Sequence, residues 1–310
     1  MKILVITNCG IGDQIQFSSL IAGLKNKFND SEITIFCHND LKFIYEYDEN
    51  VKTVTSEIND EEFDIGYNFA LKNDLLDIFQ EISINERVGF SRRRGFETRT
   101  KNAIIKEQRG IKATNSSARK LMLILLTKKR SDKLLSEWLC EIANVQWTKP
   151  YFTYDKTVSL PVLEQKHNIV IQYGTNIEEK NWSDENYEKL IGLIDPEITI
   201  WITAKENPKE FISRLEKYEY KNVFFFINKS FSEIASLLTK SDLIISPDTS
   251  IAQVGLALNV NTIVLSSKYD RGFTLSKKIN NLILIEKETI NEISPNDIIE
   301  KLHDIEYLPV

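Results

Sequence analysis

Residues 241–265, SDLIISPDTSIAQVGLALNVNTIVL, contain the pattern that decides the fold prediction. The apolar run at 243–245 is short and is closed by a serine and Pro247, which is typical of a strand that is buried on both faces and ends at the proline. Residues 248–250 can each cap a helix, and the apolar residues after them recur at helical spacing: Ile251, Val254 and Leu258. A second strand is expected at 262–265, so the stretch predicts a strand, a turn, a helix and a strand.

This order of elements leaves free N–H groups and the positive end of a helix dipole at the carboxyl edge of a parallel sheet. Such an edge is a favourable place for a phosphate group. An ordinary capped βα unit has the same sequence pattern, however, so the stretch indicates a function only together with a second site.

Length and composition narrow the class of protein. A chain of 310 residues has room for two domains, and 42% hydrophobic with 27% charged residues is typical of a globular protein. The net charge of -6 argues against general nucleic-acid binding. Three scattered cysteines without metal-ligand spacing favour a reducing compartment, and neither a membrane span nor a signal peptide is evident. We therefore expect a cytoplasmic protein.

The amino-terminal segment predicts a βαβ unit. A strand is expected at 3–6, a glycine-bearing turn at 8–13, a helix from about 14 to 28 and a strand at 32–37. Asp13 then lies where the helix begins, as a catalytic carboxylate or as a simple helix cap. A dinucleotide-binding fingerprint would need glycine where Ile15 stands, so that cofactor site is not supported.

A basic segment follows the first α/β pattern. Residues 87–133 contain fifteen Lys or Arg residues against three acidic ones, in a chain that is acidic overall. Arginine clusters bind phosphate and carboxylate groups, and we expect Arg92, Arg93 and Arg94 to bind an acidic partner. The apolar residues nearby, such as those at 121–126, would also suit an anionic membrane surface. A solvated helix surface is the alternative interpretation.

The second half repeats the order of strand, polar turn and helix. Residues 146–163 have the character of a connector, a strand is expected at 167–173, and Thr175 and Lys180 on the next turn could contact a diphosphate. Trp182 is expected to pack beneath this turn. Glu206 follows another expected strand and could reach a ribose. The sequence thus predicts two Rossmann-like domains, at 1–155 and 156–310, that face each other across a cleft.

Three motifs together carry a resemblance to a known family. They are G-x-G-D ending at Asp13, G-T-x-x-x-x-K-x-W at 174–182, and S-P-D-T at 246–249. In order and spacing they resemble the ADP-heptose:lipopolysaccharide heptosyltransferases of glycosyltransferase family 9. The resemblance spans nearly the whole chain and implies the GT-B fold, an α/β architecture with the acceptor bound by the first domain and the nucleotide sugar by the second.

The resemblance also implies a reaction and its site residues. It implies inverting, metal-independent transfer of a heptose or related sugar from an ADP-sugar to a lipid-linked or oligosaccharide acceptor, with no cofactor, and possible peripheral contact with the inner membrane. The family's base falls on Asp13. Its donor contacts fall on the following residues: Thr175, Lys180, Glu206, Asp248 and Thr249.

The chain departs from the family pattern after the last motif. The family commonly has glycine and histidine where Ser250 and Gln253 stand, and both of these residues can still donate hydrogen bonds to a donor sugar. Inversion at an anomeric carbon needs a carboxylate that accepts the acceptor proton and a group that stabilises the leaving diphosphate. Asp13 can supply the first, and Lys180 with the helix at 248–250 the second. The alternatives are a GT-B enzyme with another nucleotide sugar, such as an epimerase, and a catalytically silent relative that binds an anionic glycan.

Overall fold

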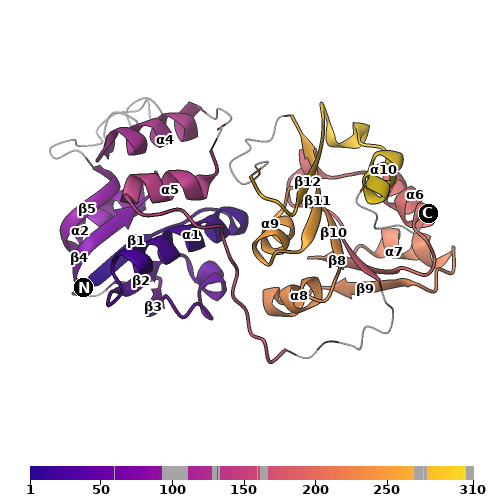
Figure 1. Cartoon of the computed structure of the whole chain (residues 1–310), viewed down its shortest axis with the longest axis horizontal. Coiled ribbons are helices and arrows are strands. Elements are labelled where there is room, and N and C mark those ends of the chain that lie inside the picture. Colours follow the sequence, from indigo (N-terminus) through magenta and orange to yellow (C-terminus); the bar gives the residue numbers. More distant parts are fainter. Residues whose placement is uncertain are drawn as a thin grey trace. The chain divides into compact units, whose positions relative to one another are not determined.

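The protein is described by a computed structural model that covers residues 1–58, 60–92, 111–127, 131, 133–158, 160, 167–268, 275 and 278–304. The chain divides into two compact units (Figure 1). The first is built from Met1–Thr153 and the second from Tyr154–Asp270 and Leu275–Val310. Each unit has its own sheet and is described by itself.

The sheet of the first unit has the strand order β3-β2-β1-β4-β5-β6. All neighbouring strands are parallel except β5 and β6. The strands are β1 (Lys2–Ile6), β2 (Glu32–Phe36), β3 (Thr53–Thr55), β4 (Glu62–Asn68), β5 (Ser83–Arg92) and β6 (Ile111–Ala113). The helices are α1 (Ile11–Lys27), the 3₁₀ helix η1 (Asn39–Ile44), α2 (Asn73–Glu81), α4 (Ser116–Thr127) and α5 (Leu135–Ala143).

The sheet of the second unit has the order β12-β11-β10-β7-β8-β9, and all of its neighbouring strands are parallel. Its strands are β7 (Asn168–Gln172), β8 (Thr199–Ala204), β9 (Val223–Ile227), β10 (Leu243–Pro247), β11 (Asn261–Ser267) and β12 (Leu282–Lys287). Its helices are η2 (Glu178–Lys180), α6 (Asp184–Leu193), α7 (Lys209–Glu216), α8 (Phe231–Leu238), α9 (Ser250–Ala257), η3 (Ile290–Glu292) and α10 (Pro295–Asp304).

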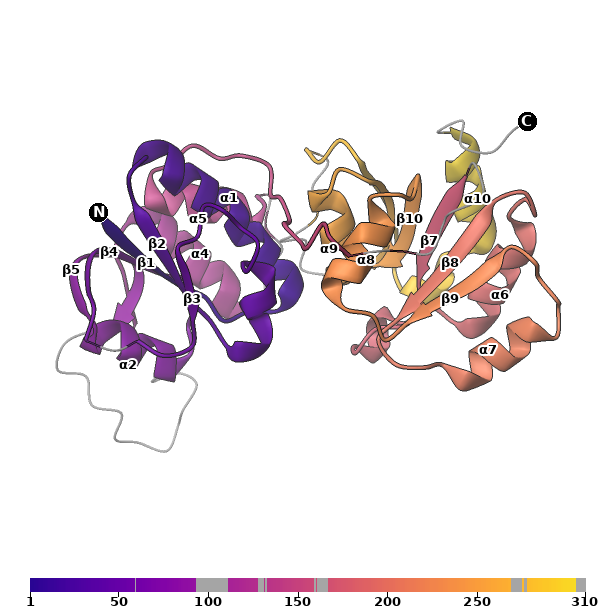
Figure 2. The ribbon, with the colours of Figure 1, turned by 90° about the horizontal axis from the view of Figure 1, so that it is seen from below.

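Counted within each unit, both sheets therefore have the strand order 3-2-1-4-5-6 of the Rossmann fold. Helices cover both faces of each sheet (Figure 2), which is why the central strands are buried and largely apolar. The side chains of β1 after Lys2, and all five residues of β7 and of β10, are buried. The order reverses between β1 and β4 in one unit and between β7 and β10 in the other. Ligands of open α/β sheets bind at such switch points.

Most of the elements expected from the sequence are present, and two expectations need correction. The ladder of β10 does not stop before the proline, because Pro247 still pairs with Leu265. Proline cannot donate a ladder hydrogen bond, but its carbonyl can still accept one. Helix α1 begins three residues earlier than expected, and its N-cap is Gly10, so Asp13 lies in the first turn and is not the cap.

The structure also contains elements for which no prediction was made, notably the long strand β5, the antiparallel strand β6 and helix α4. Within the described residues, none of the helices combines the length and the hydropathy that crossing a membrane would require.

Candidate functional site

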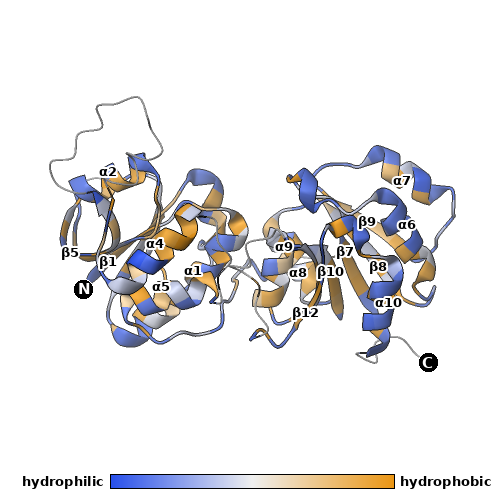
Figure 3. Ribbon diagram, turned by 90° about the horizontal axis from the view of Figure 1, so that it is seen from above, coloured by the Kyte–Doolittle hydropathy of each residue, from blue (hydrophilic) through white to orange (hydrophobic). Residues whose placement is uncertain are grey.

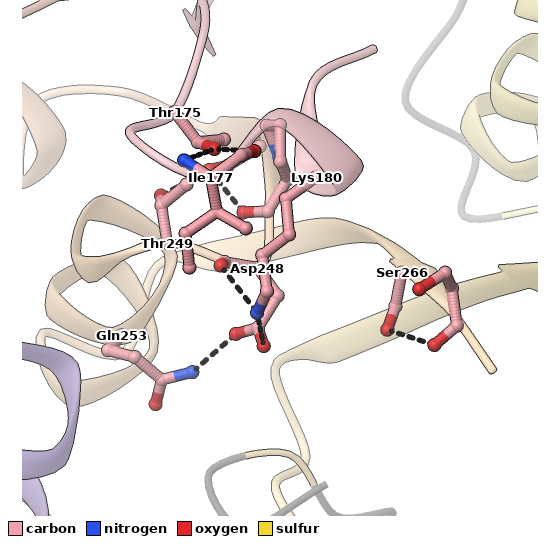
Figure 4. A network of polar contacts seen from close by, with 10 residues as sticks. Thr175, Ile177, Lys180, Asp248, Thr249, Gln253 and Ser266 are labelled. Atoms are coloured by element: carbon pink, nitrogen blue, oxygen red, sulfur yellow. Dashed lines mark hydrogen bonds and ion pairs between the residues drawn. The ribbon is translucent and has the colours of Figure 1, made fainter. Parts of the chain in front are cut away.

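Lys180 and Asp248 meet at the switch point of the second unit. Lys180 ends η2 in the loop after β7, and Asp248 follows the neighbouring strand β10. The Nζ atom of Lys180 donates to Oδ2 of Asp248 at 2.8 Å and to the Asp248 backbone carbonyl at 3.3 Å (Figure 4). The two side chains are 20% and 14% exposed, so solvent still reaches this ion pair. The parallel sheet thus brings together two residues that lie far apart in the sequence.

Gln253 approaches the same carboxylate from α9. Its Nε2 atom lies 3.5 Å from Oδ1 of Asp248, and the side chain is only 3% exposed. Figure 4 shows Lys180 and Gln253 converging on Asp248 from different elements. The carboxylate of Asp248 is therefore held by a cation on one oxygen and approached by an amide on the other.

The turn that carries Lys180 is fixed by its own hydrogen bonds. The Thr175 hydroxyl donates to the carbonyl of Ile177 at 2.7 Å and accepts from the Ile177 amide at 2.9 Å. The Thr175 amide donates to Oδ1 of Asn181 at 2.6 Å. Gly174 has φ of +72°, a left-handed conformation that disfavours a side chain. Asn181 was not singled out from the sequence, where it is one polar residue among many in this turn.

A network of buried polar side chains lies beneath this turn. Gln172 donates through Nε2 to the carbonyls of Tyr173 and Gly174 at 2.9 and 3.3 Å, and accepts from the Thr203 hydroxyl at 2.9 Å. The Tyr187 hydroxyl donates to the Gln172 carbonyl at 2.9 Å, and burial raises the pKa of Tyr187 far above its usual range. These bonds tie the end of β7 to β8 and α6.

Of the other residues predicted for donor binding, two lie at the start of α9 and one lies beyond β8. Thr249 is the N-cap of α9, but its hydroxyl pairs with Ser246 at 3.0 Å and caps no amide of the helix. Ser250 is the first residue of α9. Glu206 lies just beyond β8, is exposed, and makes no hydrogen bond or ion pair with the residues that the structure describes. The structure therefore does not bring Glu206 into contact with Lys180, Asp248 or Gln253.

The packing role predicted for Trp182 is confirmed. Its side chain is 2% exposed, and the indole N–H donates to the carbonyl of Ile293 at 2.8 Å. The ring also lies edge-on to Tyr187 at 4.9 Å between centroids. Trp182 thus supports the turn from below.

In the first unit, Asp13 lies in the first turn of α1, directly after the end of β1. The next side chain, Gln14, is fully buried, and its Oε1 atom accepts from the hydroxyls of Thr7 at 2.9 Å and Tyr45 at 2.5 Å. Tyr45 also donates to the Gln14 backbone carbonyl at 3.1 Å. These bonds fix the start of α1, the turn that carries Asp13.

Cys9 lies in the same turn as Asp13. Burial, and then the nearby carboxylate of Asp13, raise the pKa of the Cys9 thiol well above its usual range. The thiol is therefore protonated near neutral pH and is a poor nucleophile. Asp13 is the group of this turn with the chemistry of a base.

A cavity of about 970 Å³ lies elsewhere in the first unit. The side chains that line it come from α2, β5, β6, α4 and the residues between them: Gln80, Arg87, Ser91, Arg92, Ile111, Lys112, Ala113, Thr114, Arg119, Met122 and Leu123. Basic groups dominate its charge. Part of the basic segment of the sequence therefore gathers around one hollow.

The arginines of this cavity differ in their partners. Arg87 donates to four backbone carbonyls at and after the end of α2, at 2.6 to 3.4 Å. Arg92 holds Asp77 with two hydrogen bonds of 2.6 and 3.0 Å, and this arginine lowers the pKa of Asp77. Arg93 and Arg94, also predicted to bind the acceptor, lie outside the described residues. Within those residues, no group of three or more His, Cys, Asp or Glu side chains could hold a metal ion.

Two of the three comparisons with known proteins point to the same family. Residues 89–303, more than half of the chain, match the family model of glycosyltransferase family 9 (heptosyltransferase). The search of curated proteins finds no significant match.

Three solved structures are similar to the whole chain. Escherichia coli heptosyltransferase WaaC with ADP is 13% identical, with a TM-score of 0.73 and coverage of 98% of this chain and 99% of that one. A family 9 glycosyltransferase from Veillonella parvula is 15% identical, with a TM-score of 0.71 and coverage of 98% and 96%. Escherichia coli ADP-heptose lps heptosyltransferase II is 16% identical, with a TM-score of 0.68 and coverage of 98% of both chains. The α/β GT-B fold expected from the sequence is thereby confirmed.

Proposed function

The chain belongs to glycosyltransferase family 9, and we propose that this glycosyltransferase moves a heptose, or a related sugar, from an ADP-sugar to an anionic glycan acceptor of the lipopolysaccharide type. The observation that carries the proposal is the partly exposed cation of Lys180, held at the switch point in front of α9. Two of the similar structures contain ADP or are named for ADP-heptose, which supports an adenine nucleotide as the donor.

The diphosphate of the donor would bind at the Lys180 turn. A Lys ammonium is a point charge that suits a phosphate oxygen, and the amides at the start of α9 add donors and a positive helix end. Thr249 leaves these amides without a side-chain cap, and Ser250 and Gln253 supply further donors near them. These groups could stabilise the leaving diphosphate without a divalent cation, so we propose a metal-independent reaction with no cofactor. Glu206 would reach the ribose.

Asp13 would act as the base. Its carboxylate accepts the proton of the acceptor hydroxyl while the hydroxyl oxygen forms a bond to the anomeric carbon. The bond from that carbon to the diphosphate oxygen breaks on the opposite side, so the configuration is inverted. Proton transfer of this kind contributes a factor of about 10² to 10⁴ to the rate.

The acceptor would bind to the first unit. The cavity with Arg87, Arg92, Lys112 and Arg119 offers positive charge to a phosphorylated or carboxylated glycan. Because Arg92 already holds Asp77, an anion would displace this carboxylate or bind beside it. Arg93 and Arg94 remain proposed acceptor contacts. A lipid-linked acceptor would bring the protein to the cytoplasmic face of the inner membrane, in the reducing compartment that suits its three free cysteines.

Thermal-shift measurements with ADP-, GDP-, UDP- and dTDP-sugars test the donor. A ligand that binds only the native state raises the melting temperature, so we expect selective stabilisation by the ADP-sugar. Lys180→Ala should weaken ADP binding about 10- to 100-fold, because a hydrogen bond to a charged group is lost. Lys189→Ala, a change of an exposed lysine on α6, is the matched control and should bind normally.

The outcomes separate the alternatives. Selective stabilisation by a UDP-sugar, or unchanged ADP binding in Lys180→Ala, would overturn the proposed donor site. Donor binding without any release of ADP in the presence of anionic glycans would instead identify a catalytically silent binder. Transfer that stops when a chelator is added would overturn the metal-independent mechanism.

A further inference from the structure

Strand β9 forms one outer edge of the second sheet and contains only apolar residues (Figure 2). Its sequence is VFFFI, and Phe224 within it is 43% exposed. Proteins usually protect an edge strand by making it very short or by placing charged residues in it. The other edges of the two described sheets follow this rule, because β3 and β6 have three residues each and β12 contains Glu286 and Lys287. Strand β9 is therefore an unprotected edge.

The backbone of β9 has free hydrogen-bonding groups on its outer side. The Asn222 carbonyl accepts from an amide of β8 at 2.8 Å, and the Asn228 amide donates to a carbonyl at the end of β8 at 3.0 Å. Every second residue of a parallel edge strand bonds to its neighbour, so the even-numbered residues of β9 face β8. The N–H and C=O groups of Val223, Phe225 and Ile227 then face outward. Among the described residues, β9 pairs with β8 alone.

An aromatic row crosses the sheet and ends at this edge. Phe224 stacks on Trp201 of β8, with ring centroids 5.1 Å apart and 27° between the planes, and Trp201 lies edge-on to Phe226 at 6.2 Å. Figure 3 shows hydrophobic residues along the strands of the second sheet and hydrophilic residues over much of α7, the helix before β9. An aromatic side chain on an added strand would continue the row beyond Phe224.

The charges around β9 suit a second copy of the same strand. Two identical edges related by a two-fold axis pair in antiparallel orientation. Pairing centred on Phe224 places Val223 opposite Phe225 of the second copy, so that their outward backbone groups match. Glu219 and Lys229 are both exposed and stand at equal distances before and after Phe224. Each therefore approaches its opposite charge in the second copy.

The alternative register is centred on Phe225 and is disfavoured by charge. It uses the same backbone groups, but it places Lys221 opposite Lys229 of the second copy. Both lysines are exposed, and Lys229 keeps 39% exposure although it pairs with Glu233 at 3.2 Å. Like charges directly opposite each other destabilise a pair of strands. Charge complementarity thus favours a second copy as the partner and selects one register.

We propose that the protein forms a symmetric dimer in which β9 of one copy pairs antiparallel with β9 of the other. The second sheets of the two copies become one continuous sheet, and Phe224 packs against its counterpart. One strand from each copy makes most of the contact, so a Kd on the order of 10 μM is expected. The donor site lies between β7 and β10, away from this edge, and dimerisation does not depend on which sugar is transferred.

Analytical ultracentrifugation of the full chain tests this contact. We expect an equilibrium of monomer and dimer that Phe224→Lys weakens about tenfold, because the aromatic contact is lost and two lysines face each other. Leu284→Lys is the matched control, because Leu284 is 37% exposed on β12 at the opposite edge of the same sheet. This control should dimerise like the unaltered protein. Unchanged ADP binding in both variants shows that the second unit is folded.

Exchange of charges tests the register and does not alter the apolar strand. Glu219→Lys and Lys229→Glu should each weaken the dimer about threefold, because each change sets like charges against one another. The double variant should restore the dimer, and high salt should diminish all of these differences. Lys189→Glu changes an exposed charge on α6 and should have no effect. If Phe224→Lys melts at a lower temperature, the charge variants decide the question.

A cysteine at the centre of the contact gives a covalent test. Residues directly opposite each other in an antiparallel pair have Cβ atoms about 4.5 to 5.5 Å apart, within reach of a disulfide after a small adjustment. With oxidised glutathione, Phe224→Cys should therefore form a disulfide-linked dimer. Leu284→Cys is the control and should remain a monomer on a non-reducing gel.

Three results would overturn the proposal. The first is a monomer at about 200 μM, far above the expected Kd, which would leave the edge of β9 to a strand of another protein. The second is a dimer that Leu284→Lys dissociates and Phe224→Lys does not. The third is a double charge variant that dimerises no better than either single variant. Failure of the ADP-sugar experiments would leave the dimer unchanged, so the two proposals fail separately.

Discussion

The two units share a strand order but differ in the segment that follows their first strand. In the first unit, residues 7–10 lead directly into the long helix α1, whose first turn carries the carboxylate of Asp13. In the second unit, residues 173–183 form a longer turn with its own short helix, which carries the cation of Lys180. The same fold thus presents a carboxylate at one switch point and a lysine paired with a carboxylate at the other. Function depends on these connecting segments, because the sheet only positions them.

The largest effect is expected from the carboxylate of the first unit. Asp13→Asn should lower the rate of sugar transfer about 10³-fold, because an amide cannot accept the proton of the acceptor hydroxyl. Binding of the ADP-sugar, measured by calorimetry, should be unchanged, since the donor is assigned to the second unit. Asp74→Asn is the matched control, because Asp74 occupies the first turn of α2. Transfer at the normal rate in Asp13→Asn would show that Asp13 is not the base and that the first unit does not supply it.

The buried tyrosines provide the next comparison. Tyr45 supports the start of α1 through Gln14, and Tyr187 supports the end of β7 through Gln172. Each change to Phe should lower the free energy of unfolding by about 1 to 2 kcal/mol, because Tyr187 loses one buried hydrogen bond and Tyr45 loses the two that its hydroxyl makes with Gln14. The kinetic consequences should differ. Tyr45→Phe should lower kcat with little change in the donor KM, whereas Tyr187→Phe should raise the donor KM. Steady-state kinetics measure both values. The same pattern in both variants would show that the roles assigned to the two units are wrong.

Much of the architecture could be predicted because the strands are short apolar runs between polar turns. The strand expected at 3–6 is β1, and the strand expected at 167–173 is β7. The prediction failed where tertiary contacts decide. In 83–92 charged and apolar residues alternate irregularly, and β6 forms only because β5 continues beyond its parallel partner. Helix α4 at 116–127 was not predicted, because the interpretation of this segment rested on its charge.

Of the residues predicted for donor binding, the structure brings Lys180, Asp248 and Gln253 together, but the sequence did not predict their contacts. Parallel strands place all their carboxyl ends at one edge, which is why Lys180 and Asp248 could be proposed separately. Their ion pair requires β7 and β10 to be neighbours, and local patterns do not determine the strand order. Asn181 was missed because it is one polar residue among many in its turn. The bond between Arg92 and Asp77 could not be foreseen because it depends on how α2 packs beside β5.

A smaller effect is expected from the carboxylate that holds Lys180. Asp248→Asn keeps an oxygen that can accept from Lys180 but removes a negative charge that repels a diphosphate. ADP should therefore bind about threefold more tightly at low ionic strength, as expected for charges near a solvated surface. Glu197→Gln is the control, since Glu197 precedes β8 at the opposite edge of the sheet. Weaker ADP binding in Asp248→Asn would mean that orienting Lys180 matters more than the repulsion.

The smallest effect concerns acid stability, where each unit has one comparable carboxyl group. Lys133 and Ser117 lower the pKa of Glu141 at α5, and the Ser230 backbone amide is the main cause of the lowered pKa of Glu233 at α8. A carboxyl group with a lowered pKa stabilises the folded state above its unfolded value of 4.5, and this contribution is lost as the pH falls through the folded pKa.

Both side chains are partly exposed, so each change to Gln should cost less than about 1 kcal/mol at pH 7, and progressively less as the pH falls below 4.5. Amide hydrogen exchange can assign the loss to a unit. Glu141→Gln should accelerate exchange in α5 and leave α8 unchanged, and Glu233→Gln should do the reverse, because each unit has its own core. Acceleration of exchange in both helices by either change would show that the two units unfold together. The stability of each unit could then not be compared separately.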